Sequence, residues 1–591
     1  MKDSYDVIVV GSGAAGFSTA DWLVSRGIND ICIMTENVNS GTSRNAGSDK
    51  QTYYKLDVSS DAGDSVMKMA EDLFRGGAMN GTDALTEAAY SLRCFMRLAE
   101  AGVPFPTDPY GRYVGYRTDH DNTCRATSAG PLTSKLMTEK LQEKVERDGV
   151  EILDGHTVIK LIAERNCCGG VICLHDGKMK AIRAKAVILC TGAPAAMYSR
   201  SVYPESQRGA TGLAIEAGAE LANFQEWQYG IASVGFRWNL SGSYQQVVPR
   251  YYSVDEDGNE YEFLASSGDK DIYTKVFLKG YQWPFSAEKT EGSSGVDMLI
   301  FRELEKGRRV FLDYTRDPEG FDFDALSDEA KDYLNAAECT GNTPYERLMQ
   351  LNPKAVKLYA DHGIDLSSVP LEISLSAQHN NGGIRTDGNS ETSVKRLFAV
   401  GEAAGKFGCA RPGGSALNDT QVGGLRAAEY LARVLGELTV PEIEIKYPEK
   451  PYLSGNANLT RLEEGLTLMM SDCAGMFREY EKLNALIPEL KNLAQHYHET
   501  VSIPDFSFIE EYYIFRQTVF SMLALCETEL SSIDHAGSRG GCLCFRNGRR
   551  VKENKKYRKL VTVTRSTGVF YVPVEPIPKE KYVFEQLLKE G

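Results

Sequence analysis

The residues near the N-terminus have the types and spacing of a dinucleotide-binding site. Gly11, Gly13 and Gly16 follow an apolar run at 6–10. In such a turn the first glycine permits the tight bend, the second lets the backbone approach a pyrophosphate, and the third lets the next helix pack closely on the strand. Glu36 ends a second apolar run about twenty residues later, where a carboxylate can bind a ribose hydroxyl. This order of strand, turn, helix, strand and acid predicts a dinucleotide site rather than a merely tight turn.

The elements expected around this turn alternate between strands and helices, which is typical of a parallel sheet covered by helices. The expected strands and helices are 6–10, 17–26, 31–34, 184–192, 396–404 and 419–435. Between them, the aromatic and polar texture of 222–370 indicates an inserted cap domain. Helical periodicity follows over 456–530, and the last sixty residues mix a loop with strands.

Composition excludes several classes of protein. A chain of 591 residues is too long for one hydrophobic core. A net charge of −15 without a compensating basic stretch argues against a nucleic-acid groove. The thirteen cysteines form no CxxC pair, so we expect buried thiols, no metal site and no disulfides. No signal peptide or membrane-spanning run is recognised, and we expect a cytoplasmic protein.

Five later segments carry further motifs, at 40–47, 377–384, 397–404, 408–418 and 532–541. They resemble, in this order, the GGNSxxAxGG, HYxMGGI, glutamate-bearing, GANRLGANSL and ESRGAH segments of one family. With the N-terminal glycines, they make most of the chain similar to the succinate dehydrogenase/fumarate reductase flavoproteins, which include L-aspartate oxidase.

The resemblance implies an α/β fold: a Rossmann-like FAD-binding domain with an inserted α+β capping domain, a C-terminal helical region and a small β-containing tail. The expected bounds are 1–221 and 371–436 for the FAD-binding domain, 222–370 for the cap, 437–530 for the helical region and 531–591 for the tail. The residues expected to bind FAD are Gly11, Ser12, Gly13, Ala14, Ala15, Gly16, Glu36, Asn37, Ser43, Arg44, Asn45, Gly47, Ser48, Val158, Thr191, Gly192, Glu402, Ser415, Ala416 and Leu417. Ser43 and Arg44 stand where the membrane complexes carry the flavin-linking histidine, so we expect noncovalent FAD.

Three residues are candidates for catalysis. Arg411 lies where the family's arginine clamps a substrate carboxylate, although it could instead pin its loop to a cap carboxylate. His379 is a candidate proton donor or acceptor, or a satisfied loop histidine. Trp227 replaces a cap histidine and is expected to form a pocket wall, or else to be a core aromatic. His120 and Asp297 are weaker candidates for proton transfer.

The substrate machinery of the family is only partly present. Ser294 stands at the position of the family's proton-shuttling arginine, the nearest arginine is Arg302, and Gln378 replaces the histidine of HYxMGG. Only one cation, Arg411, is then expected at the substrate. Two buried carboxylates need more positive charge than that. We therefore expect a larger or less charged substrate than fumarate or succinate, aromatic or sugar-like.

The expected function is that of an FAD-dependent oxidoreductase, which transfers a hydride between FAD and a small organic substrate next to a carboxylate or carbonyl. Alternatives are an L-aspartate-oxidase-like oxidase and an electron-transfer subunit with an iron–sulfur partner. An open cavity at the flavin favours an enzyme, and a sealed cap interface favours the electron-transfer subunit. No second dinucleotide motif is recognised, so the electron donor or acceptor is expected to be external and is not identified.

Overall fold

A seven-stranded sheet carries the predicted glycine turn. The computed structural model describes residues 2–60, 63–118, 123–453 and 457–580, so the candidate His120 lies outside the described residues. β1 (Ser4–Val10) lies between β2 (Ile31–Met34) and β8 (Lys178–Leu189) and is parallel to both. The sheet order is β5-β2-β1-β8-β7-β6, and β17 (Leu397–Ala399) also pairs with β8. The chain therefore returns to this sheet after the cap.

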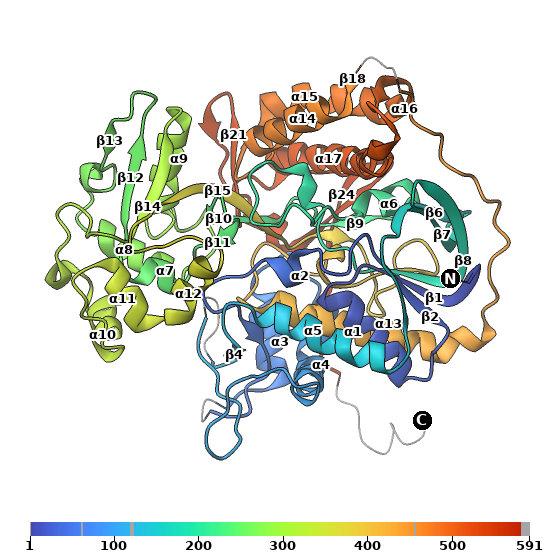
Figure 1. Ribbon diagram of the computed structural model, residues 1–591, viewed down its shortest axis with the longest axis horizontal. Coiled ribbons are helices and arrows are strands. Elements are labelled where there is room, and N and C mark those ends of the chain that lie inside the picture. Colours follow the sequence, from blue (N-terminus) through green and yellow to red (C-terminus); the bar gives the residue numbers. More distant parts are fainter. Residues whose placement is uncertain (1, 61–62, 119–122, 454–456, 581–591) are drawn as a thin grey trace.

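The helices that cover one face of this sheet converge on the glycine turn. α1 (Ala14–Ser25) packs against α13 (Ser415–Val434) and α5 (Thr133–Arg147) (Figure 1). A Cβ on Gly424 would lie 2.9 Å from the Thr19 hydroxyl, so a glycine is needed where α13 approaches α1. Both helices begin three or four residues before the predicted starts, because each follows directly from a glycine that ends the preceding turn.

The cap is built on a separate six-stranded sheet, on the left of Figure 1. Its order is β11 (Trp238–Asn239), β10 (Trp227–Ser233), β15 (Leu371–Asn380), β14 (Arg309–Asp313), β12 (Arg250–Val254) and β13 (Glu260–Tyr261), all antiparallel. β15 pairs with β10 and β14, so the sheet continues ten residues past the predicted boundary at 370. This matters for function, because the far end of β15 carries Gln378 and His379.

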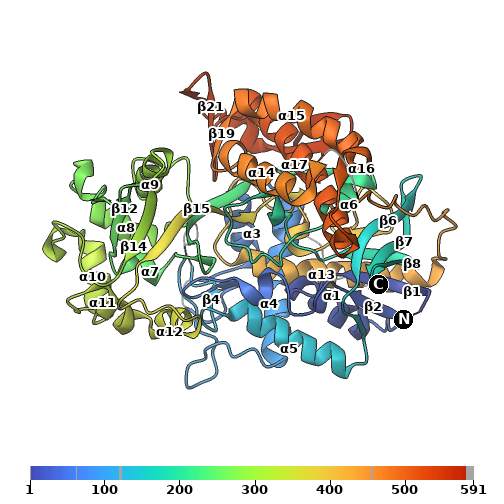
Figure 2. The ribbon, with the colours of Figure 1, turned by 45° about the horizontal axis from the view of Figure 1, so that its top comes forward.

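The C-terminal part packs beside the FAD-binding domain. α14 (Leu459–Cys473), α15 (Tyr480–Gln495) and α17 (Ile509–His535) form a helical region (Figure 2). The tail then forms β23 (Leu560–Arg565) and β24 (Gly568–Pro573), and β23 pairs with β9 (Leu221–Ala222). Within the described ranges, no helix has the length and apolar character needed to span a membrane.

Candidate active site

A cavity of about 830 Å³ lies between the glycine turn, the loop around 40–52, the start of α13 and the cap. This volume is in the range of small-molecule and cofactor sites. Most of the residues predicted to bind the cofactor line it. They are Gly11, Ser12, Gly13, Ala14, Ala15, Glu36, Ser43, Gly47, Ser48, Val158, Thr191, Gly192, Glu402, Ala416 and Leu417.

Backbone and side chains at this cavity fit a dinucleotide. Gly11 has φ of +109°, and a Cβ on Gly16 would lie 1.9 Å from the Gly11 carbonyl oxygen, so neither position accommodates a larger residue. Burial raises the pKa of Glu36 to about 7. Its carboxylate forms no hydrogen bond or ion pair with the described residues, which leaves it to accept from a ribose hydroxyl. The buried Thr191 hydroxyl also has no partner in the described structure.

Five residues predicted to bind the cofactor do not line the cavity: Gly16, Asn37, Arg44, Asn45 and Ser415. Gly16 was expected to let the helix pack closely on the preceding turn, and this role does not require it to line the cavity. The buried Arg44 guanidinium donates to Gln142 and lies over the Phe17 ring. The Ser415 hydroxyl donates to the Pro412 carbonyl at 2.8 Å. The Asn45 amide donates to backbone carbonyls of its own loop, and Asn37 is exposed. Matching motif positions do not show which way a side chain points.

Arg411 lines the cavity and is held by neutral groups. Its guanidinium donates to Gln228 Oε1 at 2.9 Å and to Asn381 Oδ1 at 3.2 Å. In the described part of the chain it forms no ion pair, so the expected alternative of pinning a cap carboxylate is not observed. Burial lowers the pKa of Arg411 to about 10, although the charge of Glu402 partly opposes this. The site therefore holds a positive charge without a direct counter-ion.

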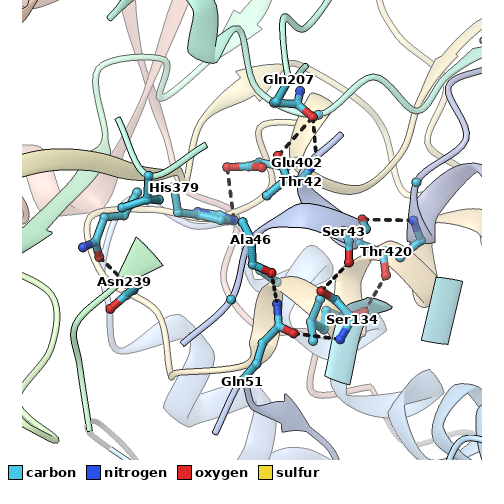
Figure 3. A pocket seen from close by; sticks show the side chains of 18 of the residues that line it. Thr42, Ser43, Ala46, Gln51, Ser134, Gln207, Asn239, His379, Glu402 and Thr420 are labelled. Carbon is cyan, nitrogen blue, oxygen red and sulfur yellow. Dashed lines mark hydrogen bonds and ion pairs between the residues drawn. The ribbon is translucent and has the colours of Figure 1, made fainter. Parts of the chain in front are cut away.

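His379 also lines the cavity, at the end of β15. Figure 3 shows its ring directed toward Glu402, and Nε2 lies 3.7 Å from Oε1 of that carboxylate. On the other side, Nδ1 lies 3.2 Å from Asn381 Oδ1. Burial, and then the charge of Arg411, lower the pKa of His379 well below its ordinary value. The ring is therefore neutral at physiological pH.

The prediction that Trp227 walls the pocket is wrong. Successive side chains of a strand point to opposite faces, and on β10 it is Gln228 that faces the cavity. Trp227 is 1% exposed and packs edge-on against Tyr198 and Tyr203. The cap aromatics that line the cavity include Trp283, whose indole N–H donates to Gln378 Oε1 at 2.7 Å. Trp227 is therefore the core aromatic of the alternative interpretation.

The cap contributes polar but mostly neutral groups to the cavity. They are Gln228, Asn239, Ser241, Gln246, Tyr281, Trp283, Tyr333 and Glu329. No lysine or arginine of the described cap lines it. Lys279 lies behind Trp283, with Nζ 5.0 Å from the ring centroid, and is paired with Asp297 at 2.7 Å; both side chains are fully buried. Asp297 is thus an ion-pair partner in the cap interior and does not line the cavity.

Further cations correct the expectation that Arg411 stands alone. Lys50 and Arg117, both from the FAD-binding domain, also line the cavity. Arg208 lines it as well, but its guanidinium is paired with the Glu511 carboxylate at 2.7 Å. Positive charge therefore reaches the cavity from the FAD-binding side, whereas the cap side is nearly neutral.

The cap positions from which the sequence suggested a second arginine supply no charge to the cavity. Ser294 is buried and accepts a hydrogen bond from the Ser286 backbone N–H. Arg302 is exposed on α9 (Gly295–Glu305) and does not line the cavity. Neither Ser294 nor Arg302 therefore supplies the second cation that the resemblance leads us to expect at the cavity.

A buried carboxylate joins the loop around 40–52 to the cap. Asp49 is 4% exposed and accepts from the backbone N–H and hydroxyl of Ser243 at 2.7 and 2.9 Å. The Asn352 amide donates to the Asp49 carbonyl at 3.1 Å. Asp49 lines the cavity together with Ser48 and Lys50, so these hydrogen bonds connect the cap to the cavity wall.

Comparison with known proteins decides the family. The family model described as an FAD binding domain matches residues 6–417. The chain belongs to the succinate dehydrogenase/fumarate reductase flavoprotein family. It is 25% identical to an L-aspartate oxidase of Streptomyces coelicolor over 84% of this chain and 82% of that protein. It is 27% identical to one subunit of the fumarate reductase (CoM/CoB) of Methanothermobacter marburgensis over 72% of each.

Members of this family are flavin-dependent oxidoreductases, and the protein is one of them, with FAD as its cofactor. The predicted α/β fold with a cap is confirmed by the solved structure of the Escherichia coli quinol fumarate reductase FrdA. That structure has a TM-score of 0.73 at 19% identity and covers 98% of each chain. A likeness at this identity shows the fold and leaves the substrate open.

Sequence reasoning missed the residues that hold the candidate catalytic groups. Asn381 contacts both Arg411 and His379, and Gln228 contacts Arg411. Asn381 lies within the recognised segment 377–384, at the position of the methionine of HYxMGGI. The replacement of an apolar methionine by a polar asparagine was the sequence feature that could have indicated its role. Trp283 gave no comparable signal, because an aromatic residue in a cap loop has no characteristic spacing.

Proposed function

We propose that the protein transfers a hydride between noncovalently bound FAD and a small organic substrate that carries a carboxylate or carbonyl beside the reacting carbon. Fumarate and succinate are not the proposed substrates. Bound FAD supplies the site that gives or takes the hydride. The glycine turn, Glu36 and the start of α13 would hold it. Noncovalent binding is supported by Ser43 and Arg44, since the Ser43 hydroxyl accepts from Ala14 N–H and Arg44 is directed away from the cavity.

The observation that carries the proposal is the charge of Arg411. A guanidinium held by Gln228 and Asn381, with no carboxylate bonded to it in the described residues, can bind a carboxylate or polarise a carbonyl of the substrate. Its charge would then stabilise negative charge that develops on that group during the reaction.

The neutral cap wall supports a substrate other than a small dicarboxylate. In the described cap, no lysine or arginine lines the cavity to pair with the second carboxylate of a dicarboxylate. The Gln378 amide nitrogen is buried without a hydrogen-bond partner in the described residues, so it offers a donor to a neutral oxygen. An uncharged ring with polar substituents matches this wall, while Lys50 and Arg117 of the FAD-binding domain add positive charge to the cavity.

The shared lining of the cavity supports an enzyme rather than an electron-transfer subunit. Residues of the cap and of the FAD-binding domain both line it, so a substrate held beside bound FAD would contact the cap. An iron–sulfur partner and an L-aspartate-oxidase-like reaction with oxygen remain the alternative proposals. The first is supported only by relatives whose names describe subunits, and the second by the L-aspartate oxidase match.

One experiment tests the proposal. Acid precipitation of the purified yellow protein should first release all the FAD into the supernatant. The flavin of intact holoenzyme is then photoreduced without oxygen, and unsaturated acids, enones and oxidised sugars are screened for its reoxidation. The oxidised enzyme is screened for bleaching by the corresponding saturated compounds and by L-aspartate. Reoxidation by fumarate as fast as by any other compound would contradict the proposed substrate class, and copurification with an iron–sulfur protein would favour the electron-transfer alternative.

A further inference from the structure

Asn381 has its side-chain amide fixed in one orientation. The residue is 1% exposed, and its Nδ2 donates to the Gly408 carbonyl at 2.9 Å. Its backbone N–H donates to the Glu226 carbonyl, and its own carbonyl accepts from the Phe407 N–H. Because Nδ2 is committed to a carbonyl, Oδ1 is the atom that faces Arg411 and His379, and it can only accept.

The tautomer of His379 follows from this orientation. Nδ1 lies 3.2 Å from Asn381 Oδ1, and a hydrogen bond there requires the proton to be on Nδ1. In a neutral ring the other nitrogen, Nε2, then carries a lone pair. Nε2 is buried and has no hydrogen-bond partner among the described residues, while the residue itself lines the cavity.

The charged groups around the ring allow Nε2 to take a proton. Burial, and then the charge of Arg411, lower the pKa of His379, so the ring rests neutral. Glu402 Oε1 lies 3.7 Å from Nε2, where a carboxylate would stabilise the imidazolium once it has formed. Oε1 also accepts from the Tyr203 hydroxyl and the Asn380 backbone N–H, and these bonds hold it in place.

We propose that Asn381 is a positioning residue that holds His379 as the Nδ1–H tautomer, so that Nε2 accepts a proton from the substrate and the site is set for dehydrogenation. This inference rests on the proposed function and gives it a direction. In the step, a substrate O–H or C–H bond breaks, its electron pair stays on the substrate, and Nε2 forms the new N–H bond. The hydride that completes the oxidation is the one that the proposed function assigns to FAD.

The test reads the tautomer in the resting holoenzyme, without turnover. The protein is labelled with ring-¹⁵N histidine, and the His379 signals are identified by their loss in His379→Gln. His362→Gln, which changes a cap histidine that does not line the cavity, is the matched control for assignment. We expect a protonated, pyrrole-type Nδ1 and an unprotonated, pyridine-type Nε2. The reverse pattern, or an imidazolium at pH 7, overturns the inference.

Variants of Asn381 separate positioning from folding. Asn381→Leu removes the acceptor, and the Nε2–H form of His379 should then appear in the same spectrum. Asn381→Asp keeps an acceptor and adds a negative charge, so the pKa of His379 should rise while the tautomer is retained. An unchanged tautomer in Asn381→Leu overturns the inference, and the wild-type spectrum decides even where a variant fails to fold.

The two proposals can fail separately. If Nε2 carries the proton while organic substrates still exchange electrons with the flavin, only the direction inferred here is lost. If the tautomer is as expected but no organic compound in the screen changes the flavin spectrum, the proposed function is lost.

Discussion

Replacing Arg411 with glutamine tests the charge on which the proposed function depends. Burial lowers the pKa of this guanidinium to about 10, which corresponds to about 3 kcal/mol of free energy that disfavours its charged form in the site. An anion bound beside it relieves part of that cost, and a hydrogen bond to a charged group contributes about 1.5–3 kcal/mol. Arg411→Gln should therefore weaken binding of an anionic ligand by about 10- to 140-fold, since 1.4 kcal/mol is a tenfold change.

The assay is a titration of oxidised holoenzyme with benzoate, followed by the change in flavin absorbance. Benzamide, which has a similar shape but no charge, is the control ligand and should bind both proteins within about twofold. Arg411→Lys keeps the charge but loses the fork that contacts Gln228 and Asn381, and it should bind benzoate with intermediate affinity. Equal benzoate affinity in wild type and Arg411→Gln, with FAD content unchanged, would refute the reasoning.

Two further predictions concern stability. Glu36 has a pKa of about 7 in the folded chain, above its ordinary value of 4.5. Between these two values the folded state binds more protons than the unfolded state. The contribution of Glu36 to the free energy of unfolding therefore falls as the pH rises from about 4.5 to 7. Glu36→Gln apoprotein should thus gain in melting temperature over wild type at pH 8 but not at pH 5, while its affinity for FAD falls; an equal difference at both pH values would contradict this. Asp297→Asn leaves Lys279 buried without its carboxylate and should lower the free energy of cap unfolding by about 3–5 kcal/mol in urea, whereas Lys279→Met with Asp297→Leu should be about neutral. A double variant as unstable as the single one would show that packing, and not charge, is the cause.

The sequence predicted the elements whose residues are constrained locally. The glycine turn requires Gly11 at positive φ and close packing at Gly16, so its pattern is visible without any tertiary contact. Arg411 could be placed at the cavity because its loop is a recognisable motif. The orientation of Trp227 could not be predicted, since a shift of one residue along a strand exchanges the two faces of the sheet.

The number of cations at the cavity could not be predicted from the sequence either. Lys50 and Arg117 lie outside the segments from which the substrate cations were counted, and only the folded chain brings them to the cavity. The contacts of Asn381 could not be predicted either, although the residue lies within a recognised motif. Its position in the motif was known, but its contacts depend on the approach of the loop that carries Gly408 and Arg411.

The bonds from Asp49 to Ser243 and Asn352 make the cap and the loop beside the flavin one mechanical unit. An outward movement of the cap would break these three bonds or displace Ser48 and Lys50, which line the cavity. Because these two residues belong to the lining that would surround FAD, the fluorescence of bound flavin would then report the position of the cap.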